Sequence, residues 1–284
     1  VLTRIPEFYW KREIIDGYEY IYIADYAIAG FNKAEPFSIG RYDACIDEDG
    51  KLHSFSGYSP STNKNITQHR AAAKLLSDEF CMLDYRYFLL QMLYLVEYAN
   101  FNSQSQLGNG IVSMRRSNTD TALIAGETTN TIVIPTNTAF YIGQQIDICS
   151  ALDNRSIAQD RTITDIEEYS QGVTEGTAIT FDGEPVDIAV GNIIQSCGQK
   201  SGHCDDLGMK SGCLSNDSKH GVIYRGIENI FGNVYNWVDG INIKDYQAYI
   251  CRNPEQYVSD KFEAPYEKIG YVNAETYGEY IKKL

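Results

Sequence analysis

The sequence contains no long apolar run. Its richest stretch, residues 88–96, is interrupted by Gln91 and is much shorter than the roughly 18 uninterrupted apolar residues of a membrane-spanning helix. Residues 1–4 lack the basic-then-apolar layout of a signal peptide. These absences predict a protein that is neither inserted into a membrane nor exported by the general secretory route.

Basic residues are also scarce. The chain has 24 Lys and Arg against 38 Asp and Glu, which gives a formal net charge of −14. Nucleic acids and anionic membranes attract basic patches, so neither is an expected partner. A neutral or cationic partner such as a glycan stays open, as does the simpler interpretation of a solvated acidic surface.

Cysteine and histidine are few and irregularly spaced, with seven and four residues. The odd number of cysteines favours thiols in a reducing cytoplasm over a disulfide framework. One group of five residues suits zinc, although its spacing matches no C-x-x-C knuckle. A loop with unligated thiols, or a disulfide between two of them, are the alternatives. The group consists of Cys197, His203, Cys204, Cys213 and His220.

Tyrosine, by contrast, is abundant: 22 Tyr stand against 11 Phe and 2 Trp. Tyrosine offers a large, stiff contact area with a polar tip, which suits recognition surfaces and subunit interfaces. Ordinary sheet faces use it equally well, so composition alone leaves both interpretations open.

The order of predicted elements is strands, two helices, then many short strands. The clearest early strand is 18–23, where aromatic and β-branched residues alternate with other residues. Amphipathic helices are expected over 66–80, with Thr67 as N-cap, and from Asp84 to about residue 100. Short β-rich runs between 113 and 199 predict a small barrel or sandwich. These runs are 131–135, 139–149, 161–169, 177–181 and 186–196.

The most informative run is residues 224–240, YRGIENIFGNVYNWVDG. It resembles the signature of formylglycine-generating-enzyme-like domains, which have a C-type-lectin-type fold and a typical G-N-V-W-E-W run. Together with INI directly after it, the run is most similar to the version in phage tail and host-attachment proteins. Residues 37–44 resemble the family's early strand, and the loop at 100–110 resembles a passage of those phage proteins. The likeness covers about 5–112 and 200–284.

This resemblance implies an α+β fold in which a C-type-lectin-like core carries an inserted small all-β domain. The core would comprise 1–112 and 200–284, and the insert 113–199. In the family the core continues with further strands, so these are expected to have been removed or to come from another chain. Trp237 is expected in the core, and Tyr235 stands where the family usually has a tryptophan. The signature positions are Asn229, Gly232, Asn233, Tyr235, Trp237 and Asp239.

The resemblance also tells us where catalytic residues would lie. The sulfatase-modifying enzymes of this fold need a cysteine pair late in the chain, and here only Cys251 follows the signature. The sulfoxide-forming iron enzymes need an H-x3-H-x-E motif, which is missing. Since a fold without its site does not imply activity, we expect a protein that is not an enzyme.

A calcium ion is the one cofactor that the resemblance suggests. Its ligands would be Asn229, Gly232, Val234 and Asn236. Asn236 stands where the family has an acid, and a neutral amide is a poorer ligand for a hard cation than a carboxylate. The alternative is that Asn229 and Asn233 hydrogen-bond neighbouring backbone at a turn.

The resemblance therefore predicts a bacteriophage virion protein of the tail or another surface appendage, assembled in the host cytoplasm. Its role would be host-surface recognition or the presentation of a recognition domain. Expected partners are other virion subunits, a second and third copy in a homotrimer, and a host glycan or protein. The rivals are a formylglycine-generating-like oxidase, a bacterial surface adhesin, and a structural head or baseplate protein. Candidate contact residues are Tyr257, Tyr266, Tyr271 and Tyr277.

Overall fold

A computed structural model describes residues 1–98, 107–273 and 280–281 of the chain. The described part is mostly β and contains two α-helices, so the predicted α+β class holds in its coarse form. Neither helix is long and apolar enough to cross a membrane. The chain forms two compact units: unit 1 comprises 1–55, 63–106 and 235–284, and unit 2 comprises 56–62 and 107–234. The proposed domain boundaries at 113 and 199 stay a prediction.

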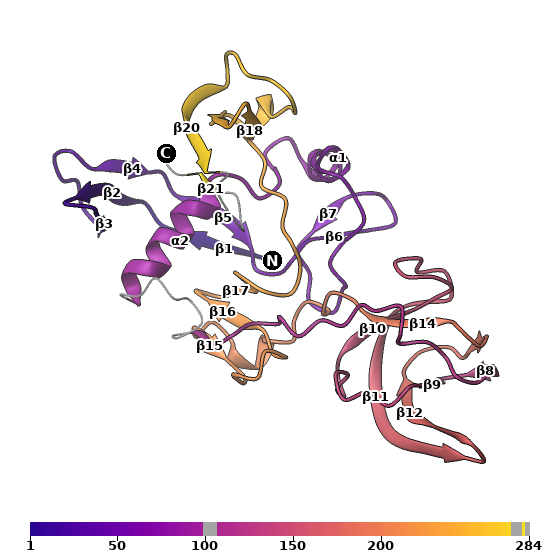
Figure 1. Ribbon diagram of the computed structural model, residues 1–284. Helices are drawn as coiled ribbons and strands as arrows, with labels where there is room; N and C mark the ends of the chain where they lie inside the picture. Colours follow the sequence, from indigo (N-terminus) through magenta and orange to yellow (C-terminus); the bar gives the residue numbers. More distant parts are fainter. Residues whose placement is uncertain (99–106, 274–279, 282–284) are drawn as a thin grey trace. The chain divides into compact units, whose positions relative to one another are not determined.

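Unit 1 contains small antiparallel sheets (Figure 1). The longest pairing is the hairpin of β2 and β3, which turns at Asp16 and Gly17, both with positive φ. Two residues of positive φ match the right-handed twist of flanking strands, which is why Asp-Gly suits this position. The strands of unit 1 are β1 (Leu2–Ile5), β2 (Phe8–Ile15), β3 (Tyr18–Ala24), β4 (Asn32–Ala34), β5 (Phe37–Gly40), β6 (Cys45–Ile46), β7 (Leu52–His53), β18 (Ile241–Lys244), β19 (Gln247–Ile250), β20 (Glu267–Asn273) and β21 (Tyr280–Ile281).

Helix α1 (Ile66–Leu76) begins at a capping box. The Asn65 side chain accepts a hydrogen bond from the Gln68 backbone at 3.0 Å, and the Gln68 side chain accepts one from the Asn65 backbone at 3.0 Å. The prediction of Thr67 as N-cap is therefore wrong, because Asn65 satisfies the first backbone N–H groups two residues earlier. The helix also ends before residue 80, since Ser77 is extended.

Helix α2 (Arg86–Glu97) follows a buried carboxylate. The N-cap residue is Tyr85, whose side chain makes no capping hydrogen bond. Asp84 Oδ1 accepts from the Arg86 backbone at 3.0 Å, and the Arg86 guanidinium binds the same carboxylate. Leu90, Leu93 and Tyr94 are its buried residues. The predicted loop at 100–110 lies mostly outside the described residues.

Unit 2 contains a five-stranded antiparallel sheet in the order β14-β10-β11-β12-β9 (Figure 1). β9 and β14 are its edges, and none of the sheets in the described residues closes into a barrel, so the barrel alternative is wrong. A core of mainly Ile and Phe side chains packs on it. The strands are β8 (Gly126–Thr129), β9 (Thr131–Ile134), β10 (Gln145–Cys149), β11 (Ala158–Gln171), β12 (Thr174–Phe181), β13 (Val186–Ile188) and β14 (Ile193–Ser196).

A second sheet of unit 2 is formed by β15 (Gly212–Cys213), β16 (Val222–Tyr224) and β17 (Ile227–Glu228). The residues between β16 and β17, Arg225 and Gly226, both have positive φ, as in the tightest hairpins. The turn places Glu228 opposite Ile223 on a strand pair that is almost entirely buried. A carboxylate thus enters the interior of unit 2.

The signature residue Asp239 connects two segments of unit 1. It is 2% exposed, and its carboxylate accepts two hydrogen bonds of 2.8 Å from the Arg70 guanidinium on α1. Its backbone N–H donates to Leu83 at 2.7 Å. A bidentate pair between an arginine and a carboxylate is strong, and it also fixes the relative orientation of the two side chains. The chain after Trp237 is therefore held against α1 and the segment that precedes α2.

Asp239→Ala is expected to lower the free energy of unfolding by roughly 3–5 kcal/mol, because the mutation leaves the Arg70 cation without its buried partner. Denaturant unfolding followed by circular dichroism measures this loss. The control is Glu267→Ala, which removes an exposed pair with Arg252 and should cost less than about 1 kcal/mol. Equal losses in the two variants would contradict a special role for Asp239.

Candidate functional site

The signature residues belong to different units: those up to residue 234 lie in unit 2, and those from residue 235 lie in unit 1. Asn233, in unit 2, is buried, and its side chain makes two hydrogen bonds to the Gln199 backbone, 2.7 Å from Oδ1 to N and 3.2 Å from Nδ2 to O. Gly232 has a φ of 81°, and a Cβ there would lie 2.8 Å from the backbone N of Ile111. The Asn233 side chain thus bonds backbone, but its partner is distant in sequence rather than the neighbouring turn that was expected.

The expectation that Trp237 is a core residue is wrong. Tyr235 is fully exposed and Trp237 is 51% exposed. Trp237 Nε1 donates to the backbone oxygen of Lys64 at 3.2 Å, which holds the indole at the surface of unit 1. Asp239, rather than either ring, is the buried side chain of this segment.

The predicted calcium ligands also divide. Asn229, Gly232 and Val234 belong to unit 2, whereas Asn236 belongs to unit 1 and is exposed. Asn229 is buried in a left-handed conformation with a φ of 53°. Calcium binding stays a prediction.

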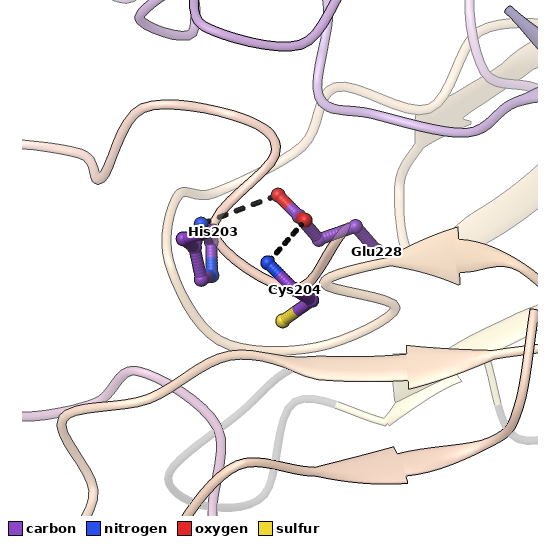
Figure 2. A group of neighbouring side chains, drawn as sticks. All are labelled: His203, Cys204 and Glu228. Carbon is purple, nitrogen blue, oxygen red and sulfur yellow. Dashed lines mark hydrogen bonds and ion pairs between the residues drawn. The ribbon is translucent and has the colours of Figure 1, made fainter. Parts of the chain in front are cut away.

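The five Cys and His residues that suit zinc by residue type do not all converge. Cys213 donates to the backbone oxygen of Ser215, and His220 pairs with Asp217 at 2.9 Å. Cys197 lies beside two aspartates in another part of unit 2. Of the five, only His203 and Cys204 lie together, and the residue that joins them is Glu228, which no metal-ligand spacing in the sequence indicates (Figure 2).

Glu228 organises this group through its two carboxylate oxygens. Its side chain is 1% exposed. Oε1 accepts a hydrogen bond from Gly202 N at 2.8 Å, and Oε2 accepts one from Cys204 N at 2.9 Å. His203 Nδ1 lies 3.2 Å from Oε1, so the carboxylate contacts both the ring and the loop that carries it (Figure 2). Hydrogen bonds to a charged acceptor are the stronger class.

The contacts of His203 determine which ring nitrogen carries the proton. Nδ1 is 2.9 Å from the backbone oxygen of Lys200. A carbonyl only accepts, so Nδ1 must donate, and in the neutral ring Nε2 then holds the lone pair. Nε2 is buried and has no hydrogen-bond partner in the part of the chain that the structure describes. The ring therefore presents an unused acceptor to the interior.

A second group of ligand-type residues, Asp147, Asp160 and Cys197, is occupied by a cation of the protein itself. Arg155 lies 2.6 Å from the Asp147 carboxylate and 2.7 Å from that of Asp160. Burial raises the pKa of the Cys197 thiol, and the two aspartates raise it further. A neutral thiol beside a satisfied ion-pair network has little tendency to bind a metal ion.

Two of the candidate contact tyrosines are not exposed. Tyr257 is buried and donates to Asp84 at 2.9 Å, and Tyr266 is buried and bonds the backbone of Val258. Burial raises the pKa of Tyr257, with Asp84 contributing next. Tyr271 is exposed, and Tyr277 lies outside the described residues.

No protein-family model, curated protein or solved structure matches this chain.

Glu228→Gln is expected to lower the free energy of unfolding by roughly 2–3 kcal/mol. The amide is neutral and has a single acceptor oxygen, so it can accept a hydrogen bond from only one of the two backbone N–H groups. Denaturant unfolding measures the change. The matched control is Glu167→Gln on β11, where the side chain is exposed and the change should stay within about 0.5 kcal/mol. A Glu228→Gln chain as stable as the original would show that these hydrogen bonds contribute nothing net.

Proposed function

We propose that this chain is a non-catalytic bacteriophage virion protein, on the tail or another surface appendage, that recognises a host surface or presents a domain that does. The observation that carries the proposal is the run 224–240, which resembles that of phage attachment proteins. The proposal includes a C-type-lectin-like core for the chain outside the β-rich insert.

Exposed aromatic side chains in the C-terminal part of unit 1 support a recognition role. Two of them lie within the run 224–240, one lies in the turn between β18 and β19, and one lies on β20. Large amphipathic rings give contact area at low entropic cost, and they suit sugars and proteins alike. The group consists of Tyr235, Trp237, Tyr246 and Tyr271.

Tyr246 is the most telling member of this aromatic group. It forms the two-residue turn of the β18–β19 hairpin with Asp245, and both have positive φ, 49° and 59° in chain order. Glycine or asparagine is favoured at such positions. An exposed tyrosine there is strained, and strain of this kind is found where function requires the side chain.

The oxidase alternative receives no support from the described geometry. Cys251 is buried, and its Sγ lies 3.5 Å from the backbone oxygen of Asn253. It is the one cysteine after the signature, whereas copper chemistry in the family needs two. We expect no formylglycine formation when the chain is assayed with copper and a sulfatase peptide, and turnover in that assay would favour the oxidase.

Immunogold electron microscopy of phage particles that encode this chain tests the proposal. We expect gold label on the tail or on another appendage. Label confined to the head would instead favour the structural alternative, and unlabelled particles would overturn the virion assignment. Mass measurement of the purified chain in solution tests the proposed homotrimer, which a monomer at micromolar concentration would remove.

Tyr246→Gly separates stability from recognition. The change is expected to raise the free energy of unfolding by about 1 kcal/mol, because glycine tolerates the left-handed conformation, and to weaken binding of the labelled chain to host cells. Tyr26→Ala, which removes an equally exposed ring elsewhere in unit 1, is the matched control and should leave binding unchanged. Unchanged binding in Tyr246→Gly would exclude this turn from the contact surface.

A further inference from the structure

We propose that unit 2 holds a zinc-type divalent cation through His203 Nε2, Cys204 Sγ and Asn229 Oδ1, with Glu228 as the residue that positions the histidine. This site is independent of the recognition function proposed above. It follows from the convergence of three different donor atoms on one glycine.

The glycine is Gly221, the residue before β16. A Cβ at this position would lie 2.1 Å from His203 Nε2, 2.6 Å from Asn229 Oδ1 and 2.9 Å from Cys204 Sγ. An imidazole nitrogen, an amide oxygen and a sulfur therefore all lie close to the same point. Any larger residue at 221 would fill the space that the donors share.

The loop and the strands hold these donors rigidly. Glu228 binds the backbone of Gly202 and Cys204, and Asn229 N donates to the backbone oxygen of Val222 at 2.7 Å. Cys204 and Val222 are fully buried. Donors that are fixed before the ion arrives lose little conformational entropy on binding it.

The histidine has the second contact that metal-binding histidines usually show. Such a residue donates its other ring N–H to a carboxylate or a backbone carbonyl, and this contact fixes the tautomer and aims the lone pair at the metal. In His203, Nδ1 faces both the Lys200 carbonyl and Glu228, and Nε2 is buried without a hydrogen-bond partner among the described residues.

The chemistry of the donors selects the ion. Thiolate and imidazole are the ligands that zinc prefers, whereas calcium takes oxygen ligands only. A site made of one sulfur, one imidazole nitrogen and one amide oxygen therefore favours a zinc-type ion over calcium.

Cobalt substitution tests the site in the full 284-residue chain. The chain is stripped of metal under reducing conditions and titrated with Co²⁺, and Zn²⁺ then displaces the cobalt. We expect a sulfur-to-cobalt charge-transfer band that saturates at a single equivalent and disappears with zinc. Cys204→Ser should abolish the band, and His203→Gln and Glu228→Gln should each weaken zinc affinity by about 10–100-fold.

Two matched controls come from the same part of the chain. Cys213→Ser and His220→Gln remove one thiol and one imidazole of the group that suits zinc by residue type and should leave the titration unchanged. Absence of the band in the original chain, or its persistence in Cys204→Ser, would overturn the proposal.

A second measurement keeps the test decisive if Cys204→Ser does not fold. The melting temperature of the original chain should rise when zinc is added to the metal-free form, because an ion that binds only the folded state stabilises it. Gly221→Ala should abolish this rise, since its Cβ would occupy the shared space. No rise in the original chain would overturn the site.

Discussion

The Glu228 carboxylate is the interaction on which the arrangement of unit 2 around β16 and β17 depends. A carboxylate that is almost fully buried must be satisfied by hydrogen bonds or ion pairs. Glu228 is satisfied by the N–H groups of Gly202 and Cys204 and by the His203 ring. If the loop moved away from the strand pair, the buried Glu228 carboxylate would lose these hydrogen-bond donors. The same contacts place a thiol and an imidazole beside a glycine.

Unit 1 uses buried acids in the same way. Asp239 binds Arg70 of α1, and Asp84 accepts from Arg86 and from the hydroxyl of Tyr257. Burial raises the pKa of the nearby Cys81 thiol to about 11, with Asp84 contributing next. Among the described residues, every buried acid contacts at least one hydrogen-bond donor or cation. These acids are thus satisfied within the chain itself.

Local patterns predicted much of the secondary structure. The β-rich runs between 131 and 196 correspond to β9 to β14, and both amphipathic helices form near their expected starts, because alternation and helical spacing reflect burial directly. Thr67 was the wrong cap because Asn65, with Gln68 three residues later, makes the stronger reciprocal pair. Barrel closure depends on strand pairing between distant segments, and no local signal contains that information.

The candidate site was predictable only in part. His203 and Cys204 stood out by residue type, but Glu228 and Gly221 contribute through contacts set by the β16–β17 hairpin and its left-handed turn. Trp237 was expected in the core because large apolar residues usually lie there, and the hydrogen bond to Lys64 keeps it at the surface. Residue type was thus enough to select His203 and Cys204, whereas Glu228 and Gly221 could be selected only once the backbone path of the hairpin was known.

The most direct test of the proposed organisation around Glu228 is the tautomer of His203, measured by long-range proton–nitrogen correlation spectroscopy on the metal-free chain near neutral pH. The account predicts a protonated Nδ1 and an Nε2 with the chemical shift of an unprotonated nitrogen, and it predicts that Nε2 shifts when zinc is added. A neutral ring protonated at Nε2 would contradict it, because Nδ1 would then have no proton to donate to Lys200 or Glu228.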